Sequence, residues 1–153
     1  MSELDTDTAA FMSRLAEAKR ANTPERVCHE IPYTRFMGMS LENHAGEVLG
    51  HMAFTDMLIG NPTLPALHGG TLGSLLETTG LLTLMWEVEL AAAPKTINLT
   101  VQYLRSGQPV DVWAKATLTR HGRRVANVHV AAWQEDRARP VATANLHALI
   151  QPA

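Results

Sequence analysis

The sequence predicts an α+β domain in which an antiparallel sheet packs against one long, buried helix. Residues 69–86 would be apolar on nearly every side of a helix, which is the pattern of a helix enclosed by other elements. Residues 110–119 alternate between apolar and polar side chains, with the period of a half-buried strand. Short turns separate the expected strands, and strands joined by tight turns pair in antiparallel fashion. These patterns favour a helix layered on a sheet.

The other segments extend this arrangement along the chain. Residues 5–20 carry apolar side chains on one face and predict an amphipathic helix at the N-terminus. Two short strands are expected near residues 39–43 and 47–55. Residues 61–67 contain two prolines and are expected to form a loop. After the central helix, which ends near residue 87, four strands are expected at residues 97–104, 110–119, 125–134 and 141–150.

Length and charge set the broad class. A chain of 153 residues fits one domain, and we expect an N-terminal helical extension over residues 1–26 and a single domain over residues 27–153. A net charge of −2 gives no reason to expect a nucleic acid or a membrane as partner. The N-terminus lacks the basic and apolar regions of a secretory signal, so we expect a cytoplasmic protein.

Several common kinds of catalytic site are disfavoured. Cys28 is the only cysteine, so it cannot form an intramolecular disulfide, and it is expected to be inert. The chain has no His-Glu-x-x-His motif and no paired cysteines, so no metal is expected. It also lacks the Gly-x-Ser-x-Gly elbow of the serine α/β-hydrolases.

One carboxylate lies inside the apolar helix. Glu77 is the only charged residue between His68 and Glu87, and no basic residue lies one turn away from it. Burying a carboxylate is costly unless it is paired or hydrogen-bonded. Two interpretations stay open: a structural glutamate bonded to a distant Arg or Thr, or a carboxylate tuned to act as base or nucleophile.

The start of the same helix can bind negative charge. Gly69 and Gly70 have no side chains, so a ligand or another backbone segment can approach closely. The first N–H groups of a helix are unpaired, and the helix dipole makes that end positive. Such an end can hold a phosphate or a developing oxyanion. A His-Gly-Gly turn followed by an isolated Glu nine residues after the His is a stronger signal than either feature alone.

Residues 68–80, which read His-Gly-Gly-Thr-Leu-Gly-Ser-Leu-Leu-Glu-Thr-Thr-Gly, resemble the signature of hotdog-fold acyl-CoA thioesterases. The similarity is to the PaaI type, from phenylacetic acid degradation, and to the 4-hydroxybenzoyl-CoA thioesterases. Residues 98–106 and 120–123 resemble further segments of that family, so the resemblance covers about residues 31–150. It implies a curved antiparallel sheet wrapped around one long central helix. It also implies a homodimer, often paired into a tetramer, whose active sites lie at the subunit interface.

The resemblance also implies roles for individual residues. Glu77 matches the catalytic carboxylate, which attacks the thioester carbonyl or activates a water molecule to do so. The Gly69 N–H matches the group that polarises the carbonyl and holds the oxyanion. Asn61 matches the amide residue that positions the carbonyl or the water. His68 matches the histidine near the leaving group, and Thr96 matches a Ser or Thr that hydrogen-bonds water or the carboxylate.

The chain departs from the family pattern at two places. The segment from Asn61 to His68 is one residue longer than in the close PaaI-type relatives. The benzoyl-type relatives carry a hydroxyl residue four positions after the catalytic carboxylate, where this chain has Leu81. Three alternatives stay open for the missing hydroxyl: Thr96 supplies it, Thr78 supplies it, or no residue does.

Positively charged side chains near turns are candidates for contact with the CoA phosphates, because Arg suits phosphate well. The expected substrate-binding residues are Gly70, Arg105, Arg120 and Arg123, and His121 and Arg124 lie at the same turn as further candidates. The alternative interpretation of each Arg is an ordinary solvated charge at a turn.

The leading functional hypothesis is hydrolysis of an acyl- or aryl-CoA thioester to a carboxylic acid and CoA, with no cofactor beyond the substrate itself. The alternative is a non-catalytic protein of the same fold that binds or senses acyl-CoA. A hydratase is disfavoured because those enzymes pair an Asp with a His in a motif order that this chain lacks. The sequence does not identify the acyl group.

Overall fold

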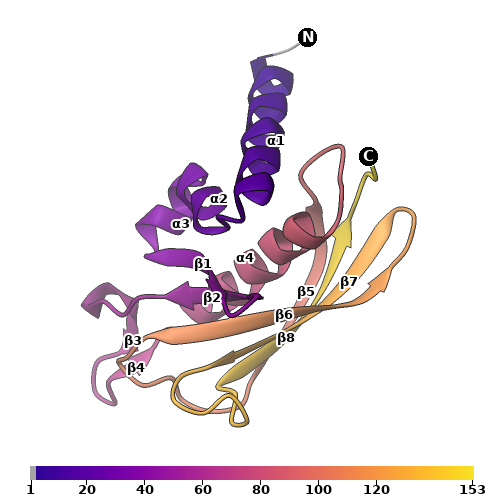
Figure 1. The fold of residues 1–153 in the computed structure, drawn as a ribbon. Helices are drawn as coiled ribbons and strands as arrows, with labels where there is room; N and C mark the ends of the chain where they lie inside the picture. Colours follow the sequence, from indigo (N-terminus) through magenta and orange to yellow (C-terminus); the bar gives the residue numbers. More distant parts are fainter. Residues whose placement is uncertain (1–2) are drawn as a thin grey trace.

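The computed structural model describes residues 3–153, with side chains from residue 7 onward. An antiparallel sheet curves along the long helix α4 (Gly69–Glu87), as Figure 1 shows. Its strand order is β1-β2-β6-β7-β8-β5. The strands are β1 (Met39–His44), β2 (Glu47–Met52), β5 (Lys95–Tyr103), β6 (Val112–His121), β7 (Val125–Trp133) and β8 (Ala142–Leu149).

The remaining elements lie outside this central layer. Three helices precede the sheet, and α2 and α3 pack against β1, while α1 packs on α2. They are α1 (Glu3–Ala21), α2 (Glu25–Glu30) and α3 (Pro32–Phe36). A separate two-stranded ribbon precedes α4 and follows a short 3₁₀ helix. These elements are η1 (Asp56–Leu58), β3 (Ile59–Asn61) and β4 (Ala66–Leu67).

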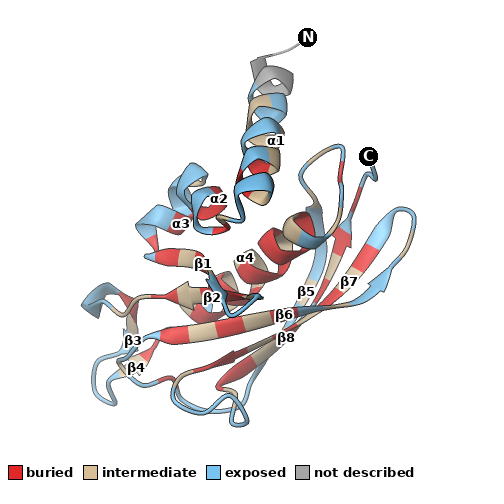
Figure 2. Cartoon of the chain, viewed as in Figure 1, coloured by how far each residue is buried: buried red, intermediate tan, exposed pale blue. Residues whose placement is uncertain are grey.

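Helix α4 lies in the core because its apolar side chains meet the sheet along most of its length. Leu75 and Leu76 are completely buried, and Figure 2 shows buried residues along α4 and the strands that face it. The contact with β2 is close, because a Cβ atom on Gly50 would lie only 2.0 Å from the Thr79 Oγ1. Glycine at position 50 therefore lets the helix sit directly on the strand.

The predicted α+β architecture is confirmed, and the central helix begins and ends at the predicted residues. The N-terminal helix and the six strands of the main sheet also lie within a few residues of their predicted places. Two predictions were incomplete. The segment expected to be a loop at residues 61–67 begins and ends in the short strands β3 and β4. Helices α2 and α3 were not predicted, and the expected division after residue 26 falls inside α2.

Helices α2 and α3 were missed because they are too short to show a helical period of apolar residues. Helix α2 has six residues and α3 has five, less than two turns each. Pro32 occupies the first turn of α3, where a missing N–H costs nothing. None of the described helices is long and apolar enough to cross a membrane.

Candidate active site

The hydrogen bonds at the start of α4 leave one amide unused. His68 is the N-cap, and its Nδ1 accepts a hydrogen bond from the Gly70 N–H at 2.9 Å. The His68 carbonyl oxygen accepts from the Thr71 N–H at 3.0 Å and from the Thr71 hydroxyl at 2.6 Å. Within the described residues, the Gly69 N–H has no hydrogen-bond acceptor. An unpaired amide at the positive end of a helix can hold an anion or an oxyanion.

The His68 ring is oriented by the same bonds. Because Nδ1 accepts from Gly70, the proton of the neutral imidazole lies on Nε2. The His68 N–H donates to the Leu58 carbonyl at 2.8 Å. A Cβ atom on Gly60 would lie 2.6 Å from the His68 Cα, so β3 holds the His68 backbone closely. The exposed ring therefore presents Nε2–H as a hydrogen-bond donor at the N-terminal end of α4.

Tyr103 covers the first turn of α4 from strand β5. Its hydroxyl donates to the Gly69 carbonyl at 2.9 Å. A Cβ atom on Gly69 would lie 3.2 Å from two atoms of the Tyr103 ring, so the absence of a side chain allows this close approach. Tyr103 was not predicted as a site residue, because a tyrosine at the end of a strand is common and no sequence motif marks it.

Glu77 has one hydrogen-bond partner among the described side chains. The Thr96 hydroxyl donates to the Glu77 Oε1 at 2.6 Å. Glu77 is half-buried and Thr96 is exposed, so the pair lies at the surface of the chain. Both residues were predicted to belong to the site, and the structure brings them together.

A β-bulge in β5 turns Thr96 toward the helix. Val101 faces α4, because a Cβ atom on Gly73 would lie 4.0 Å from its Cγ2. Regular alternation from Val101 would turn Ile97 toward the helix and Thr96 away from it. The pairing of β5 with β8 shifts register at Ile97, which makes Ile97 the extra residue. The bulge reverses the alternation, so Thr96 reaches Glu77.

Gly69, at the start of α4, and Glu77, in its middle, are far apart within one chain. Gly69 and Glu77 are separated by eight residues, which corresponds to about 12 Å along a helix. A reacting carbonyl must lie about 3 Å from both its oxyanion donor and its catalytic group. The Gly69 N–H and the Glu77 carboxylate of the same chain therefore cannot act on one carbonyl.

Asn61 closes the turn between β3 and β4. Its Oδ1 accepts from the Thr63 N–H at 3.1 Å and from the Leu64 N–H at 3.3 Å. This leaves the side-chain NH₂ as the part of Asn61 that can contact a substrate. In the described part of the chain, no hydrogen bond joins Asn61 to His68 or Glu77. The structure therefore places Asn61 in the hairpin that precedes His68 and not beside Glu77.

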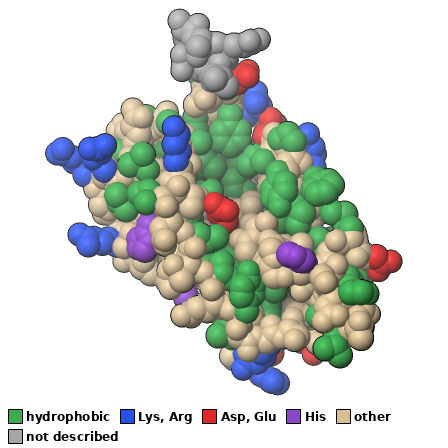
Figure 3. Space-filling model, turned by 180° about the vertical axis from the view of Figure 1, so that it is seen from behind, with side chains coloured by type: hydrophobic (Ala, Val, Ile, Leu, Met, Phe, Trp, Pro, Cys, Tyr) green, Lys and Arg blue, Asp and Glu red, His purple; other side chains and the backbone are tan. Residues whose placement is uncertain are grey.

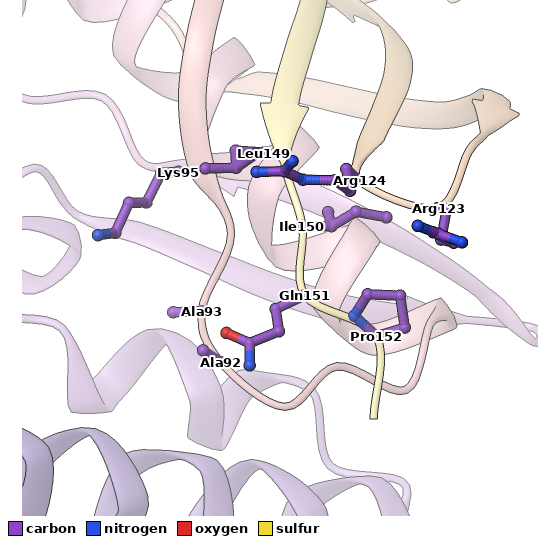
Figure 4. Close-up of a pocket in the computed structure, with 9 residues that line it drawn as sticks. All are labelled: Ala92, Ala93, Lys95, Arg123, Arg124, Leu149, Ile150, Gln151 and Pro152. Carbon is purple, nitrogen blue, oxygen red and sulfur yellow. The ribbon is translucent and has the colours of Figure 1, made fainter.

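The predicted phosphate-binding arginines fall into two groups. Arg123 lines a hollow of about 480 Å³ together with Lys95 and Arg124, as Figure 4 shows. Arg120 joins Arg123 and Arg124 in an adjacent hollow of about 360 Å³. Together Lys95, Arg120, Arg123 and Arg124 form a cationic surface at the turn between β6 and β7, the β6–β7 cationic surface. Arg124 was a candidate for phosphate contact from the sequence, whereas Lys95 was not singled out.

Arg105 lies elsewhere. Its guanidinium donates to the Pro140 carbonyl at 2.7 Å and lines a different hollow, together with Glu135, Asp136 and Arg139. The two carboxylates make that hollow less favourable for phosphate. Gly70, by contrast, lies in the first turn of α4, beside Gly69.

Other chemistries find little support in the described residues. Burial raises the pKa of the Cys28 thiol to about 12, so Cys28 stays protonated and is a poor nucleophile near neutral pH. From residue 7 onward, no three His, Cys, Asp or Glu side chains gather in a group that could hold a metal ion.

Comparisons with known proteins agree with the geometry. A family model described as the acyl-CoA thioesterase N-terminal domain matches residues 61–147. The medium/long-chain acyl-CoA thioesterase YigI of Escherichia coli is 30% identical over 128 residues, which cover 74% of this chain and 82% of that protein.

Solved structures extend the similarity to the fold. A protein from Chromobacterium violaceum is 35% identical, with a TM-score of 0.74, over 91% of this chain and 97% of that one. A phenylacetic acid degradation-related protein from Ralstonia eutropha is 26% identical, with a TM-score of 0.70, over 82% of this chain and 98% of that one. With a carboxylate on a central helix inside a curved antiparallel sheet, the chain belongs to the hotdog-fold acyl-CoA thioesterases, a family of thioester hydrolases.

Proposed function

We propose that Glu77 is the catalytic carboxylate of this thioesterase and that the Gly69 N–H forms its oxyanion site. Glu77 either attacks the thioester carbonyl carbon or takes a proton from a water molecule that attacks it. The carbonyl oxygen then becomes negative beside the Gly69 N–H, and the C–S bond breaks to release CoA as a thiolate. If water attacked, the carboxylic acid is formed in this step; if Glu77 attacked, the acyl group is left on its carboxylate as an anhydride, which a water molecule hydrolyses to the acid and free Glu77. The observation that carries this proposal is the Thr96 hydroxyl bonded to Glu77, which fixes a half-buried carboxylate in one position.

His68 and Asn61 have supporting roles in the proposed mechanism. The His68 Nε2–H is oriented by the bond between Nδ1 and Gly70, and it can donate to the departing sulfur. The NH₂ group of Asn61 can position the thioester carbonyl or the attacking water. His68 is the N-cap of α4, and Asn61 lies in the β3–β4 hairpin that leads into it.

The proposed site requires two protomers. Because Gly69 and Glu77 of one chain are about 12 Å apart, the oxyanion donor must come from one protomer and the carboxylate from the other. We therefore propose a homodimer with two equivalent active sites across its interface, and pairing of dimers into a tetramer remains compatible with it.

Strand β5 offers a surface for this dimer. It pairs with β8 on one side only and is the edge of the sheet, with Ile97 and Tyr103 more than half exposed. Strand β5 runs antiparallel to α4, because Tyr103 meets Gly69 while Thr96 meets Glu77. If two copies of β5 pair in antiparallel fashion about a two-fold axis, the partner's helix start comes beside this chain's Glu77. An exposed edge strand is also a ready site for pairing.

The bond from Thr96 to Glu77 yields a graded prediction. Thr96→Val keeps the shape of the side chain but removes the donor, and we expect kcat/KM to fall about tenfold. Thr96→Ser keeps the hydroxyl and should retain activity within about threefold of wild type. Steady-state release of CoA thiol from an acyl-CoA measures both variants. Equal losses in the two would contradict a role for the hydrogen bond.

The β6–β7 cationic surface is proposed to bind the phosphates of CoA. Replacing both Arg123 and Arg124 by Gln should raise KM about tenfold and change kcat by less than about twofold, because the lost contacts are remote from the reacting carbonyl. Arg105→Gln is the matched control, because Arg105 lines a separate hollow. A rise in KM in Arg105→Gln alone would place the phosphates at the other hollow.

The acyl group is proposed to be a medium or long aliphatic chain. The support is the name of the Escherichia coli relative, a medium/long-chain acyl-CoA thioesterase that is 30% identical to this chain.

A panel of CoA thioesters tests the proposed function. Release of free thiol is followed for acetyl, medium and long straight-chain, benzoyl and phenylacetyl thioesters. We expect turnover, with the highest kcat/KM on a medium or long acyl chain. Binding of these thioesters without any turnover would overturn the proposed function in favour of a non-catalytic acyl-CoA-binding protein.

A further inference from the structure

An apolar groove of about 380 Å³ runs between helix α4 and the N-terminal helices. Figure 3 shows hydrophobic side chains gathered around a recess below the N-terminal part of the chain. Leu81 and Met85 of α4 line one side of the groove, and Ile31 and Tyr33 line another. Among the described residues of α1, Phe11 is the only one that lines it.

The groove adjoins the proposed catalytic pair. Thr78, which directly follows Glu77 in α4, lines it. Pro94, which lies two residues before Thr96, also lines it. An acyl chain attached to a carbonyl at Glu77 therefore has an apolar channel beside it.

The groove offers almost nothing polar to a ligand. None of its lining side chains is charged. The Tyr33 hydroxyl is hydrogen-bonded with the Ser74 hydroxyl at 3.0 Å. The Thr34 hydroxyl donates to the backbone carbonyls of Cys28 and Ile31. Thr78, beside Glu77, carries the one other side-chain hydroxyl of the lining. Such a surface suits a saturated hydrocarbon chain, and the flexible Leu and Met side chains can adapt to it.

We propose that this groove binds the aliphatic acyl chain of the substrate and that Phe11 forms its end wall, so that helix α1 sets the preferred chain length. The proposal rests on the proposed function. It assigns a role to α1, which lies outside the segment that the thioesterase family model matches. The rest of the groove comes from α4, from the segment that joins α4 to β5, and from the region of α3.

The test is the dependence of kcat/KM on acyl length, measured for straight-chain CoA thioesters from two to eighteen carbons. For the wild type, kcat/KM should rise about fourfold with each added methylene while the acyl chain fills the groove, and it should then level off. In Phe11→Ala, kcat/KM should continue to rise at chain lengths where the wild type has levelled off. Its kcat/KM for the longest chains, relative to shorter ones, should therefore be about tenfold higher than in the wild type. Phe11→Trp should shift the plateau to shorter chains. Phe11→Leu gives a milder opening if the alanine variant folds poorly.

Met12→Ala is the matched control, because Met12 is the next residue of α1 but lines a different hollow, with Leu15 and Lys19. It should leave the preferred length unchanged. A purely structural role of Phe11 would change the rate for all chain lengths alike. If the wild type hydrolyses acyl-CoA but Phe11→Ala and Phe11→Trp have the same length profile, this inference is wrong while the proposed function stands. If the wild type hydrolyses no thioester, the proposed function itself fails.

Discussion

Glu77→Gln is expected to lower kcat by about 10²- to 10⁴-fold, because the amide can neither attack the carbonyl nor take a proton from water. The substitution keeps the size of the side chain, and its carbonyl oxygen can still accept the bond from Thr96. The fold and KM should therefore change little. The rate is measured as thiol release under saturating substrate, and the fold is checked by circular dichroism and thermal unfolding.

Glu87→Gln is the matched control for this experiment. Glu87 is the last residue of the same helix and is exposed, so the same change of chemistry should leave kcat within about twofold of wild type. A Glu77→Gln enzyme that keeps most of its kcat would show that Glu77 is the structural glutamate of the other interpretation.

Gly69→Pro is expected to lower kcat about 10²- to 10³-fold, which is the usual effect of removing one oxyanion donor. Proline is accepted in the first turn of a helix and removes the N–H that the proposed mechanism uses, while its ring adds a Cβ atom near Tyr103 for which the alanine variant below is the control. His68 already has φ −65° and ψ 129°, which a residue before proline adopts readily. The substitution therefore tests the amide with little change to the backbone.

Gly69→Ala distinguishes the loss of the amide N–H from the crowding caused by an added side chain. It keeps the N–H but adds a Cβ atom 3.2 Å from the ring of Tyr103, which is more than half exposed and can shift. We expect Gly69→Ala to lose less than about tenfold in kcat and the proline variant much more. Similar losses in the two variants would attribute the effect to crowding against Tyr103 and not to the oxyanion.

The sequence carried most of the information about α4. The helix is apolar on nearly all sides and begins at two glycines, so its burial could be predicted from the long apolar run and its first residue from the glycines. The isolated charge of Glu77 stood out against that apolar background. The motif beginning at His68 then supplied the family, and the family model and the relatives confirm it.

Other parts of the site depend on geometry that no local pattern encodes. Thr96 reaches Glu77 only because an extra residue at Ile97 reverses the alternation of β5, and a bulge has no reliable sequence signature. Tyr103 meets Gly69 through tertiary packing between two elements 34 residues apart. Lys95 of β5 and Arg124, in the turn between β6 and β7, line the same hollow although they are far apart in the sequence. Contacts between residues so far apart in the sequence follow from the topology of the fold and cannot be predicted from composition.

The central claim is that each active site combines the Gly69 amide of one protomer with the Glu77 carboxylate of the other. Mixed dimers test it directly. Differently tagged Gly69→Pro and Glu77→Gln chains are co-expressed, and the heterodimer is purified through both tags. In a shared-site dimer, one of the two sites combines the intact amide of the Glu77→Gln chain with the intact carboxylate of the Gly69→Pro chain. The heterodimer should then recover about half of the wild-type kcat per dimer, while each parent homodimer stays nearly inactive. A heterodimer as inactive as its parents would contradict the account, because it would mean that both groups act within one chain.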